Sequence, residues 1–505
     1  MAWGMPSTQL KPGRQLHLGP SHEGALKIVD FPTVQDTDTA PRVAGSLLCD
    51  EPFDSLPDEL ILAILEFAIL SFEVPHYPTA RALTMACRRF NGLATPLLYK
   101  YLHFDLPFKP KSRALLRIDT SHLLHCRELH VRCSDMNGAM TNTDWQITGD
   151  FLTKCTKVRR LSIHGGYTRH GVELWPLTMN LLANMPVLQH LSLARQYWGL
   201  LLPRVKKYIV STSLRHLSIN GVSESKEAPR WKSMPASFTE LRLSDYEEDA
   251  AATADLIKWP KNLRHFYFES FYNNRHHMDL AMFGSWLSSH KDTLEEIYIG
   301  YLSAFSKGTL IDVSEFSALN SLTLSRYSFS DDLESCAADA SLLLAPGLET
   351  FTWSFSIYDQ HCESWDAIGE NEERWLRQFA EAAASKSIPL KRIHIIFDPD
   401  YWGYQVEDGY PWDRLDRVKV YSRQLNIELS YTKPALTKEE WLNHITEEKK
   451  MVEENTHHSG PPYSPSSIHD SEREGPQSRN SELTTEGRDI RGFFPPTRGT
   501  QLYDH

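Results

Sequence analysis

The sequence predicts an α/β protein in which a short helical module precedes a long, open array of strand–helix repeats, with a polar segment at each end. Three observations support this fold class. A short apolar motif recurs between about residues 120 and 431, helical apolar spacing is concentrated at about 54–104, and the composition shifts towards Pro, Gly, Ser and Thr at both ends. Because one domain takes roughly 100–200 residues, a chain of 505 residues holds either several domains or one elongated array.

The composition of the two ends predicts disorder. Residues 1–51 mix Pro, Gly, Ser, Thr and Asp with few periodic apolar positions, and residues 455–505 include the run Ser459-Gly-Pro-Pro-Tyr-Ser-Pro-Ser-Ser467. Such segments bury too little apolar surface to offset the entropy that ordering costs. We therefore expect a disordered leader at 1–51 and a disordered tail at 455–505.

Residues 52–104 are expected to form the helical module. Ser55 precedes an acidic turn and a broad apolar face, as at the start of a capped helix. A second helix is expected from Thr79 to a stop at Asn91-Gly92, and a third from Thr95-Pro96, where cap and proline stand in the preferred order. Three short helices leave more apolar surface than they can bury among themselves, which predicts a docking partner.

The repeats are defined by the motif apolar-x-x-apolar-x-apolar. A degenerate first copy is Cys126–Val131, and a final strand is expected at Ile427–Leu429. One or two copies would equally fit unrelated strands of an α/β domain, but an ordered series at spacings close to the roughly 20–29 residues of leucine-rich repeats favours a solenoid of that type over 105–433. The full copies are Val158–Ile163, Leu188–Leu193, Leu214–Ile219, Phe238–Leu243, Leu263–Phe268, Leu294–Ile299, Leu319–Leu324, Leu348–Trp353 and Leu390–Ile395.

A helix at 434–454 with a Thr437–Glu440 capping box would cover the end of the array.

The motif also predicts which side chains face the core. Side chains alternate along a strand, so the two apolar residues of each L-x-L point inwards while their neighbours point outwards. Helical spacing between strands is expected at 144–155, 171–184, 278–290, 331–344 and 372–385. The outward residues stack in columns, one reading Arg160, His190, His216, Glu240, His265, Glu296, Ser321, Thr350, Arg392 and the next reading Ser162, Ser192, Ser218, Arg242, Tyr267, Tyr298, Thr323, Thr352, His394.

This outward face is the predicted substrate-binding surface. Arg242, Tyr267 and Tyr298 fall in one column on successive strands, and Tyr and Arg are favoured at protein interfaces. His190, His216, Glu240 and His265 are residue types that bind metals, but an exposed strand face carries polar residues in any case, so no metal site is predicted.

Motifs of the common catalytic machines are absent. Gly221-Val-Ser-Glu-Ser225 lacks the final glycine of a nucleophile elbow, and neither a phosphate-binding loop, a dinucleotide fingerprint nor H-E-x-x-H occurs. Cys87 lies at helical spacing in an apolar face, which favours a structural thiol over a nucleophile. We expect a protein that is not an enzyme and takes no cofactor.

Charge and hydropathy exclude further classes. The net charge of −12 disfavours a nucleic-acid binder, and the apolar run Leu60–Leu70, broken by Glu66, is far below the roughly 20 residues that span a bilayer. No C-x-x-C pair, glycosylation sequon or signal-peptide core occurs. We expect an intracellular protein, cytoplasmic and/or nuclear, with no nucleic-acid or membrane partner.

Three segments of the helical module carry a resemblance to a known family. Leu56-Pro57-Asp-Glu-Leu60, Ala86-Cys-Arg-Arg-Phe-Asn91 and Leu93-Ala-Thr-Pro-Leu-Leu-Tyr99 resemble, in this order, an F-box. With the repeats, the chain resembles the F-box/leucine-rich-repeat proteins abundant in filamentous fungi. The link Ser71–Pro78 is longer than the usual connection between the first two F-box helices, which a surface loop tolerates at small entropic cost.

The resemblance implies the substrate-recognition subunit of a Skp–cullin–F-box ubiquitin ligase. The F-box would dock a Skp-type adaptor and through it the cullin–RING ligase, and the repeats would hold a protein substrate that the sequence does not identify. Ile64, Leu83 and Phe90 could instead belong only to the intramolecular core, and the alternative function is a leucine-rich-repeat interaction scaffold outside any ligase. The adaptor-facing positions implied by the resemblance are Leu56, Pro57, Ile61, Ile64, Leu65, Leu83, Cys87, Arg88 and Phe90.

Overall fold

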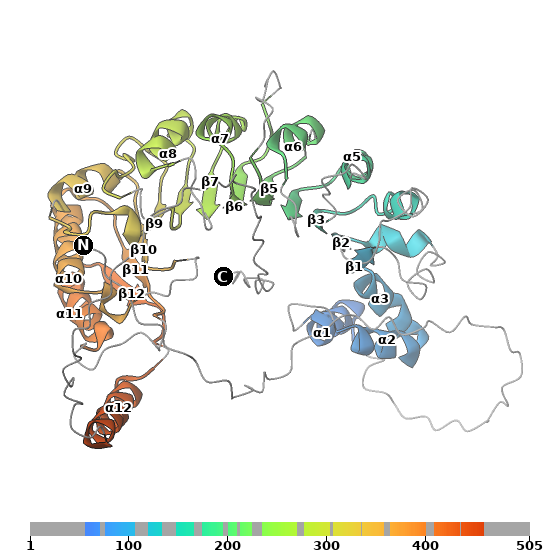
Figure 1. Ribbon diagram of the computed structural model, residues 1–505. Coiled ribbons are helices and arrows are strands. Elements are labelled where there is room, and N and C mark those ends of the chain that lie inside the picture. The colour runs from blue at the N-terminus through green and yellow to red at the C-terminus, as the bar shows by residue number, and fades with distance from the viewer. Residues whose placement is uncertain are drawn as a thin grey trace, which may run out of the picture. The chain divides into compact units, whose positions relative to one another are not determined.

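A single twelve-stranded parallel sheet with its strands in chain order dominates the computed structural model. The sheet is not closed, and Figure 1 shows helices α5 to α11 along one side of it. This arrangement confirms the expected α/β class and its solenoid-like course. The structure describes residues 56–70, 76–106, 120–133, 148–165, 174–194, 200–209, 213–224, 235–269, 277–302, 307–334, 336–357, 364–399, 409–434 and 436–458.

Every predicted copy of the motif ends in a strand, and each strand pairs in parallel with the next. One further strand precedes them all and begins at Tyr101. The strands are β1 (Tyr101–Leu106), β2 (Glu128–Cys133), β3 (Arg160–Gly165), β4 (His190–Ala194), β5 (His216–Val222), β6 (Glu240–Tyr246), β7 (His265–Glu269), β8 (Glu296–Ile299), β9 (Ser321–Ser325), β10 (Thr350–Ser354), β11 (Arg392–Ile396) and β12 (Glu428–Tyr431).

Helices connect most of the strands from β3 onwards. Helices confirm the expected spans near 171–184, 278–290, 331–344 and 372–385, and residues 148–152 are helical within the expected 144–155. Three helices had not been predicted: α6, α7 and α11. The helical segments of the array are η2 (Thr120–His125), α5 (Leu174–Asn184), α6 (Leu202–Tyr208), α7 (Ala250–Ile257), α8 (Leu280–Leu287), η3 (Ser288–His290), η4 (Arg326–Ser328), α9 (Cys336–Leu343), η5 (Trp365–Ala367), α10 (Glu370–Ser385) and α11 (Pro411–Gln424).

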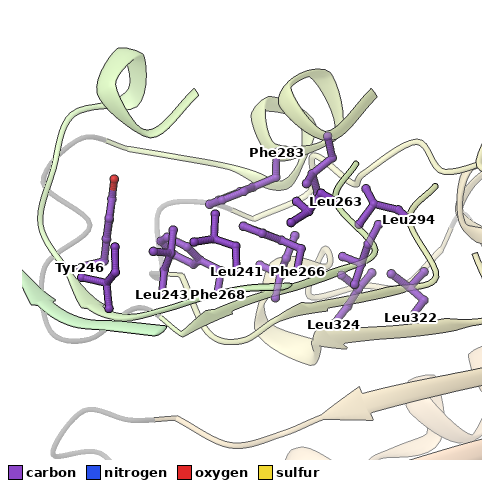
Figure 2. Packing of buried hydrophobic residues seen from close by; sticks show 14 of the residues in the cluster. Leu241, Leu243, Tyr246, Leu263, Phe266, Phe268, Phe283, Leu294, Leu322 and Leu324 are labelled. Carbon is purple, nitrogen blue, oxygen red and sulfur yellow. The ribbon is translucent and has the colours of Figure 1, made fainter. Parts of the chain in front are cut away.

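The core of the array lies between the sheet and these helices. Leu217 and Leu322, the inward residues of their L-x-L pairs, are 1% and 0% exposed. Figure 2 shows how such residues from successive strands meet, with Phe266 and Phe268 beneath Phe283 of α8. The ring centroids of Phe268 and Phe283 are 4.7 Å apart. The predicted inward register is thus confirmed.

A repeated backbone contact sets the start of each strand. The carbonyl of Arg159, just before β3, accepts hydrogen bonds from the amides of Gln189 (2.8 Å) and His190 (2.9 Å) in the next repeat. The carbonyl of Gln189 does the same for Arg215 and His216. Because the same two-amide contact recurs from strand to strand, the outward columns stay in register along the sheet.

The helical module has its own small core. Its helices are α1 (Asp58–Leu70), α2 (Tyr77–Ala86) and α3 (Arg88–Leu98), and Ile61, Leu65, Ile69, Ala80, Ala94 and Leu97 are buried together between them.

The expected helix stop at Asn91-Gly92 is wrong, because the break falls at Cys87. Cys87 has an extended backbone (φ −154°, ψ 168°), and its thiol accepts a hydrogen bond from the amide of Phe90 at 3.4 Å. Asn91 lies inside α3 and donates from its side chain to the carbonyl of Thr84 at 2.8 Å, so it satisfies the last turn of α2. Pro96 also lies inside α3, so no separate helix begins at Thr95.

The sheet begins earlier than expected, within the span 52–104 assigned to the helical module. Phe104 and Leu106 of β1 are 3% and 1% exposed and face the core of the array. The Tyr77 hydroxyl of α2 donates to the carbonyl of Tyr101 at 2.8 Å, and Lys100 pairs with Glu66 at 3.2 Å. Strand and helices therefore contact each other directly at this boundary.

The first turns of helix α12 (Lys438–His458) pack at the other end of the array. The Thr437 amide donates to Glu440 Oε2 at 2.8 Å and the Glu440 amide donates to Thr437 Oγ1 at 3.3 Å, which confirms the capping box. Trp441 and Ile445 are buried in the core, and Trp441 packs 5.6 Å from the ring of Tyr410. A helix is thus present where one was expected, and it continues to His458.

Several expectations fall outside the described residues: the leader at 1–51, the tail from 459, the Ser55 cap and most of the Ser71–Pro78 link. Across the ranges given above, no helix is long and apolar enough to cross a membrane.

Candidate binding face on the parallel sheet

The outward columns form as predicted along β4 to β8, but on β9 and β10 their members Thr323 and Thr352 are buried, at 7% and 9% exposed. Pairing joins His190 to His216, His216 to Glu240 and Glu240 to His265, and in the next column Ser218 to Arg242. Arg242 then pairs with Tyr267 and Tyr267 with Tyr298. Strand spacing of about 4.8 Å places these side chains on one continuous surface, which we call the outward face.

Glu240 on β6 is the electrostatic centre of this face. One of its carboxylate oxygens lies 2.5 Å from Nδ1 of His216 and the other accepts a hydrogen bond from Nε of Arg242 at 2.6 Å. Burial alone would raise the pKa of Glu240, but the hydrogen bonds from His216 and Arg242 outweigh it and lower that pKa to about 2. Glu240 is therefore ionised and holds Arg242 in a fixed orientation.

Arg242 in turn positions the first tyrosine. Its guanidinium carbon lies 4.0 Å from the ring centroid of Tyr267, which is a cation–π contact. The Tyr267 hydroxyl donates to Glu296 Oε2 at 2.6 Å, and the pKa of Tyr267 is raised by burial and by this hydrogen bond. The rings of Tyr267 and Tyr298 lie 6.2 Å apart at 37°. The structure thus brings together all three predicted substrate-binding residues.

Two carboxylates that the sequence reasoning had not assigned to the site flank these tyrosines. Glu296 stands beside Tyr267, and Glu269 at the end of β7 is hydrogen-bonded to Tyr298. Burial raises the pKa of Glu269, although Tyr298 and the charge of Arg242 oppose this shift. The alternation of strand β7 was the available signal, because Glu269 lies two residues after Tyr267 and so points to the same face.

The local charge balance is negative. Within the described residues, neither Glu269 nor Glu296 has a basic nitrogen within 4.0 Å. Arg242 is bonded to Glu240, and the nearby Arg264 pairs with Glu295 at 3.0 Å. These two described arginines are therefore already engaged by other carboxylates.

The histidines of the face do not form a metal site. The rings of His190 and His216 are stacked 3.9 Å apart and nearly parallel, and His216 also bonds to Glu240. Burial, with the neighbouring His216 and Arg160, lowers the pKa of His190 to about 4. Among the residues that the structure describes, no group of three or more His, Cys, Asp or Glu side chains could hold a metal ion.

The predicted adaptor-facing residues divide into three groups by exposure. Pro57, Ile64, Cys87 and Arg88 are exposed, and Leu56, Leu83 and Phe90 are half-buried against the core of the module. Ile61 and Leu65, however, are 1% and 2% exposed. These two side chains belong to the core of the module, so their contribution is to hold α1 in place and not to contact a partner.

An apolar surface on α1 extends beyond the predicted positions. Leu60 is 53% exposed, Ile64 50% and Phe67 77%. These residues stand at i, i+4 and i+7, so they share one side of the helix, opposite the buried positions. Met85 near the end of α2 is also exposed. We call Leu60, Ile64 and Phe67 the α1 patch.

One arginine of the Cys-Arg-Arg-Phe segment is structural. Arg89 pairs with Asp58 at 2.7 Å and thereby links the first turns of α3 and α1, whereas Arg88 is exposed.

Comparison with known proteins adds no assignment: no family model matches the chain, and no curated protein matches it.

Proposed function

We propose that this protein is a non-catalytic substrate receptor of a Skp–cullin–F-box ubiquitin ligase, of the F-box/leucine-rich-repeat type. Helices α1 to α3 would dock a Skp-type adaptor, and the outward face of the sheet would bind the substrate protein. Such a receptor acts by holding substrate near a ligase bound elsewhere, so it needs no reactive residue of its own.

The observation that carries this proposal is the α1 patch. Ile61 and Leu65 hold α1 on the module through its buried side, while Leu60, Ile64 and Phe67 present large apolar side chains to solvent on the other. Exposing a contiguous group of such side chains is unfavourable unless a partner covers them. The half-buried Leu83 and Phe90, in contrast, pack against the module's own core and support the adaptor surface from within.

A pull-down with a purified Skp-type adaptor tests the docking role. Ile64→Glu places a charge in the centre of the α1 patch without disturbing the core, so we expect adaptor binding to fall at least about tenfold, as for a hot-spot residue. Val420→Glu on α11 is the matched control, because Val420 is a comparably exposed apolar residue at 62%. Binding and the midpoint of thermal unfolding should both stay unchanged in this control.

Two outcomes would reject the proposal. Wild-type protein that never recovers the adaptor would favour the alternative of an interaction scaffold outside the ligase. Equal adaptor binding by wild type and Ile64→Glu would show that the α1 patch is not the docking surface. Leu56→Ala combined with Pro57→Ala provides a second variant at the start of the same helix.

A further inference from the structure

The outward face contains one complete arrangement of guanidinium, tyrosine and carboxylate, and one incomplete arrangement beside it. In the complete one, the guanidinium of Arg242 lies over the ring of Tyr267, and carboxylates stand at the two ends, Glu240 on Arg242 Nε and Glu296 on the Tyr267 hydroxyl. A cation over an aromatic face and a charge-assisted hydrogen bond to a carboxylate reinforce each other there.

The incomplete arrangement is one strand further along. Tyr298 again has carboxylates nearby, Glu269 hydrogen-bonded to it and Glu296 in the neighbouring column. On the far side of Tyr298, however, the paired residue on β9 is Thr323, which is 7% exposed and carries no charge. Among the described residues, this position therefore holds a tyrosine and two carboxylates, and neither carboxylate forms an ion pair with a basic side chain.

We propose that the outward face at β7 and β8 binds a protein segment bearing an arginine or lysine side chain, which lies against Tyr298 and pairs with Glu269 and Glu296. This inference rests on the proposed function, since it assumes that the face holds a protein, and it specifies the class of substrate. Among the described residues, the charge balance favours a basic occupant, because Arg242 and Arg264 already pair with Glu240 and Glu295.

The role of Arg242 changes accordingly. A free arginine beside two tyrosines would favour an acidic or phosphorylated partner, but Arg242 is bonded to Glu240 at 2.6 Å and stacked on Tyr267. It is a positioning residue that fixes the Tyr267 ring. The raised pKa of Glu269 agrees with this conclusion, because a carboxylate whose charge is disfavoured by burial gains from an added cation.

Oriented peptide libraries test the proposal with the full-length protein. Four libraries carry a central Arg, Lys, Glu or phosphoserine between randomised uncharged positions. We expect wild type to retain the Arg and Lys libraries about fivefold more than the other two, roughly 1 kcal/mol by the conversion of affinity to free energy, and to lose this preference at high salt. Glu269→Gln combined with Glu296→Gln should abolish the preference.

The control variant is Glu315→Gln, which removes an exposed carboxylate that pairs with Lys291 outside the strands and should leave the preference intact. The comparison of libraries on wild type stands even if the double variant fails to fold. Retention of the Glu or phosphoserine library, retention of none, or an undiminished preference in a folded double variant would overturn the proposal. Adaptor binding is measured separately, so failure of the docking role and failure of this inference are distinguishable.

Discussion

Along each strand of the array, adjacent residues have different roles. Leu217 of β5 is 1% exposed and packs towards the helices, while its neighbour Ser218 points to the outward face and pairs with Arg242 across the strands. Ser218 can vary with little effect on the core, whereas the inward leucine cannot. The outward face is therefore free to acquire binding residues without loss of the fold.

Substitutions at adjacent positions of one strand should differ sharply in stability. Leu217→Asp buries an unpaired charge, so we expect it to destabilise the array by about 3 kcal/mol or more, whereas Ser218→Ala should cost less than about 0.5 kcal/mol. Thermal unfolding followed by circular dichroism measures both. On β9, Leu322→Asp should act like Leu217→Asp, but Thr323 is itself buried at 7% exposed, so Ser218 on β5 is the outward position for the comparison. Equal shifts of the two midpoints would contradict the observed register.

The stacked histidines predict a defined pH dependence of stability. Burial lowers the pKa of His190 to about 4 in the folded protein, from about 6.5 when unfolded. Below pH 6.5 the unfolded chain binds a proton that the folded chain does not, so the free energy of unfolding falls between pH 6.5 and 4 and levels off below that range. Because the side chain is partly exposed, we expect the loss to be about 1 kcal/mol.

His190→Gln should remove this loss when the free energy of unfolding is measured against pH. Glu240→Gln should act in a lower window, since the pKa of Glu240 is lowered to about 2 and its stabilisation is lost only as the pH falls from about 4.5 towards 2. An unchanged slope between pH 6.5 and 4 in His190→Gln would show that another group is responsible.

At the scale of elements, the strands were predictable and several helices were not. The L-x-L pattern fixes the position, direction and inward side of every strand except β1, which carries no full copy of the motif. Helices α6 and α7 have only 7 and 8 residues, too few turns for a clear helical period. The break at Cys87 was missed because Asn91-Gly92 is the usual type of helix stop. Asn91 instead donates a hydrogen bond to the carbonyl of Thr84, and this contact depends on how α2 and α3 pack.

The candidate site was predictable to the same extent. Register follows from the motif, so the column of Arg242, Tyr267 and Tyr298 could be derived from the sequence. Arg242 donates a hydrogen bond to Glu240, so its positive charge is already paired. This contact depends on a side-chain rotamer that the strand register does not determine. The motif therefore places the three residues in one column, and the side-chain contacts define the charges around them.

A buried ion pair connects two elements near the end of the array. Arg326 of η4 donates to Glu372 Oε1 of α10 from Nη2 at 2.7 Å and from Nε at 3.0 Å, and both residues are buried. Glu372 Oε2 also accepts from the amide of Gly369 at 2.8 Å and so completes the start of α10. The pair holds the turn after β9 against the first turn of α10.

Breaking this pair should be costly because the remaining charge would be buried alone. We expect Arg326→Met to destabilise by about 3 kcal/mol, and Arg326→Met combined with Glu372→Gln to cost less than the sum of the two single changes. Urea unfolding monitored by tryptophan fluorescence is suitable, since Arg326 lies 5.6 Å from the ring of Trp353. Additive costs would indicate that the two side chains do not act as a pair.

Across the whole molecule, the two candidate surfaces lie on separate elements of the chain. The α1 patch is part of a module with its own core. The outward face belongs to strands β6 to β8, whose inward residues lie in the core of the array. No side chain is shared between them. Either surface can therefore be altered while the other is kept.

Replacing Arg242, Tyr267 and Tyr298 together by Ala should therefore abolish substrate capture and leave adaptor binding intact. The three residues are half-buried on the outward face, so the fold should survive, while an interface would lose two tyrosines and the residue that positions one of them, about 2 kcal/mol or more. Proximity labelling in a background carrying Ile64→Glu measures capture, because substrates accumulate when they are not handed to the ligase. A competing mechanism is recognition by the tail after Asn455. Capture that survives the triple change but disappears on truncation at Asn455 would assign substrate recognition to the tail and not to the sheet.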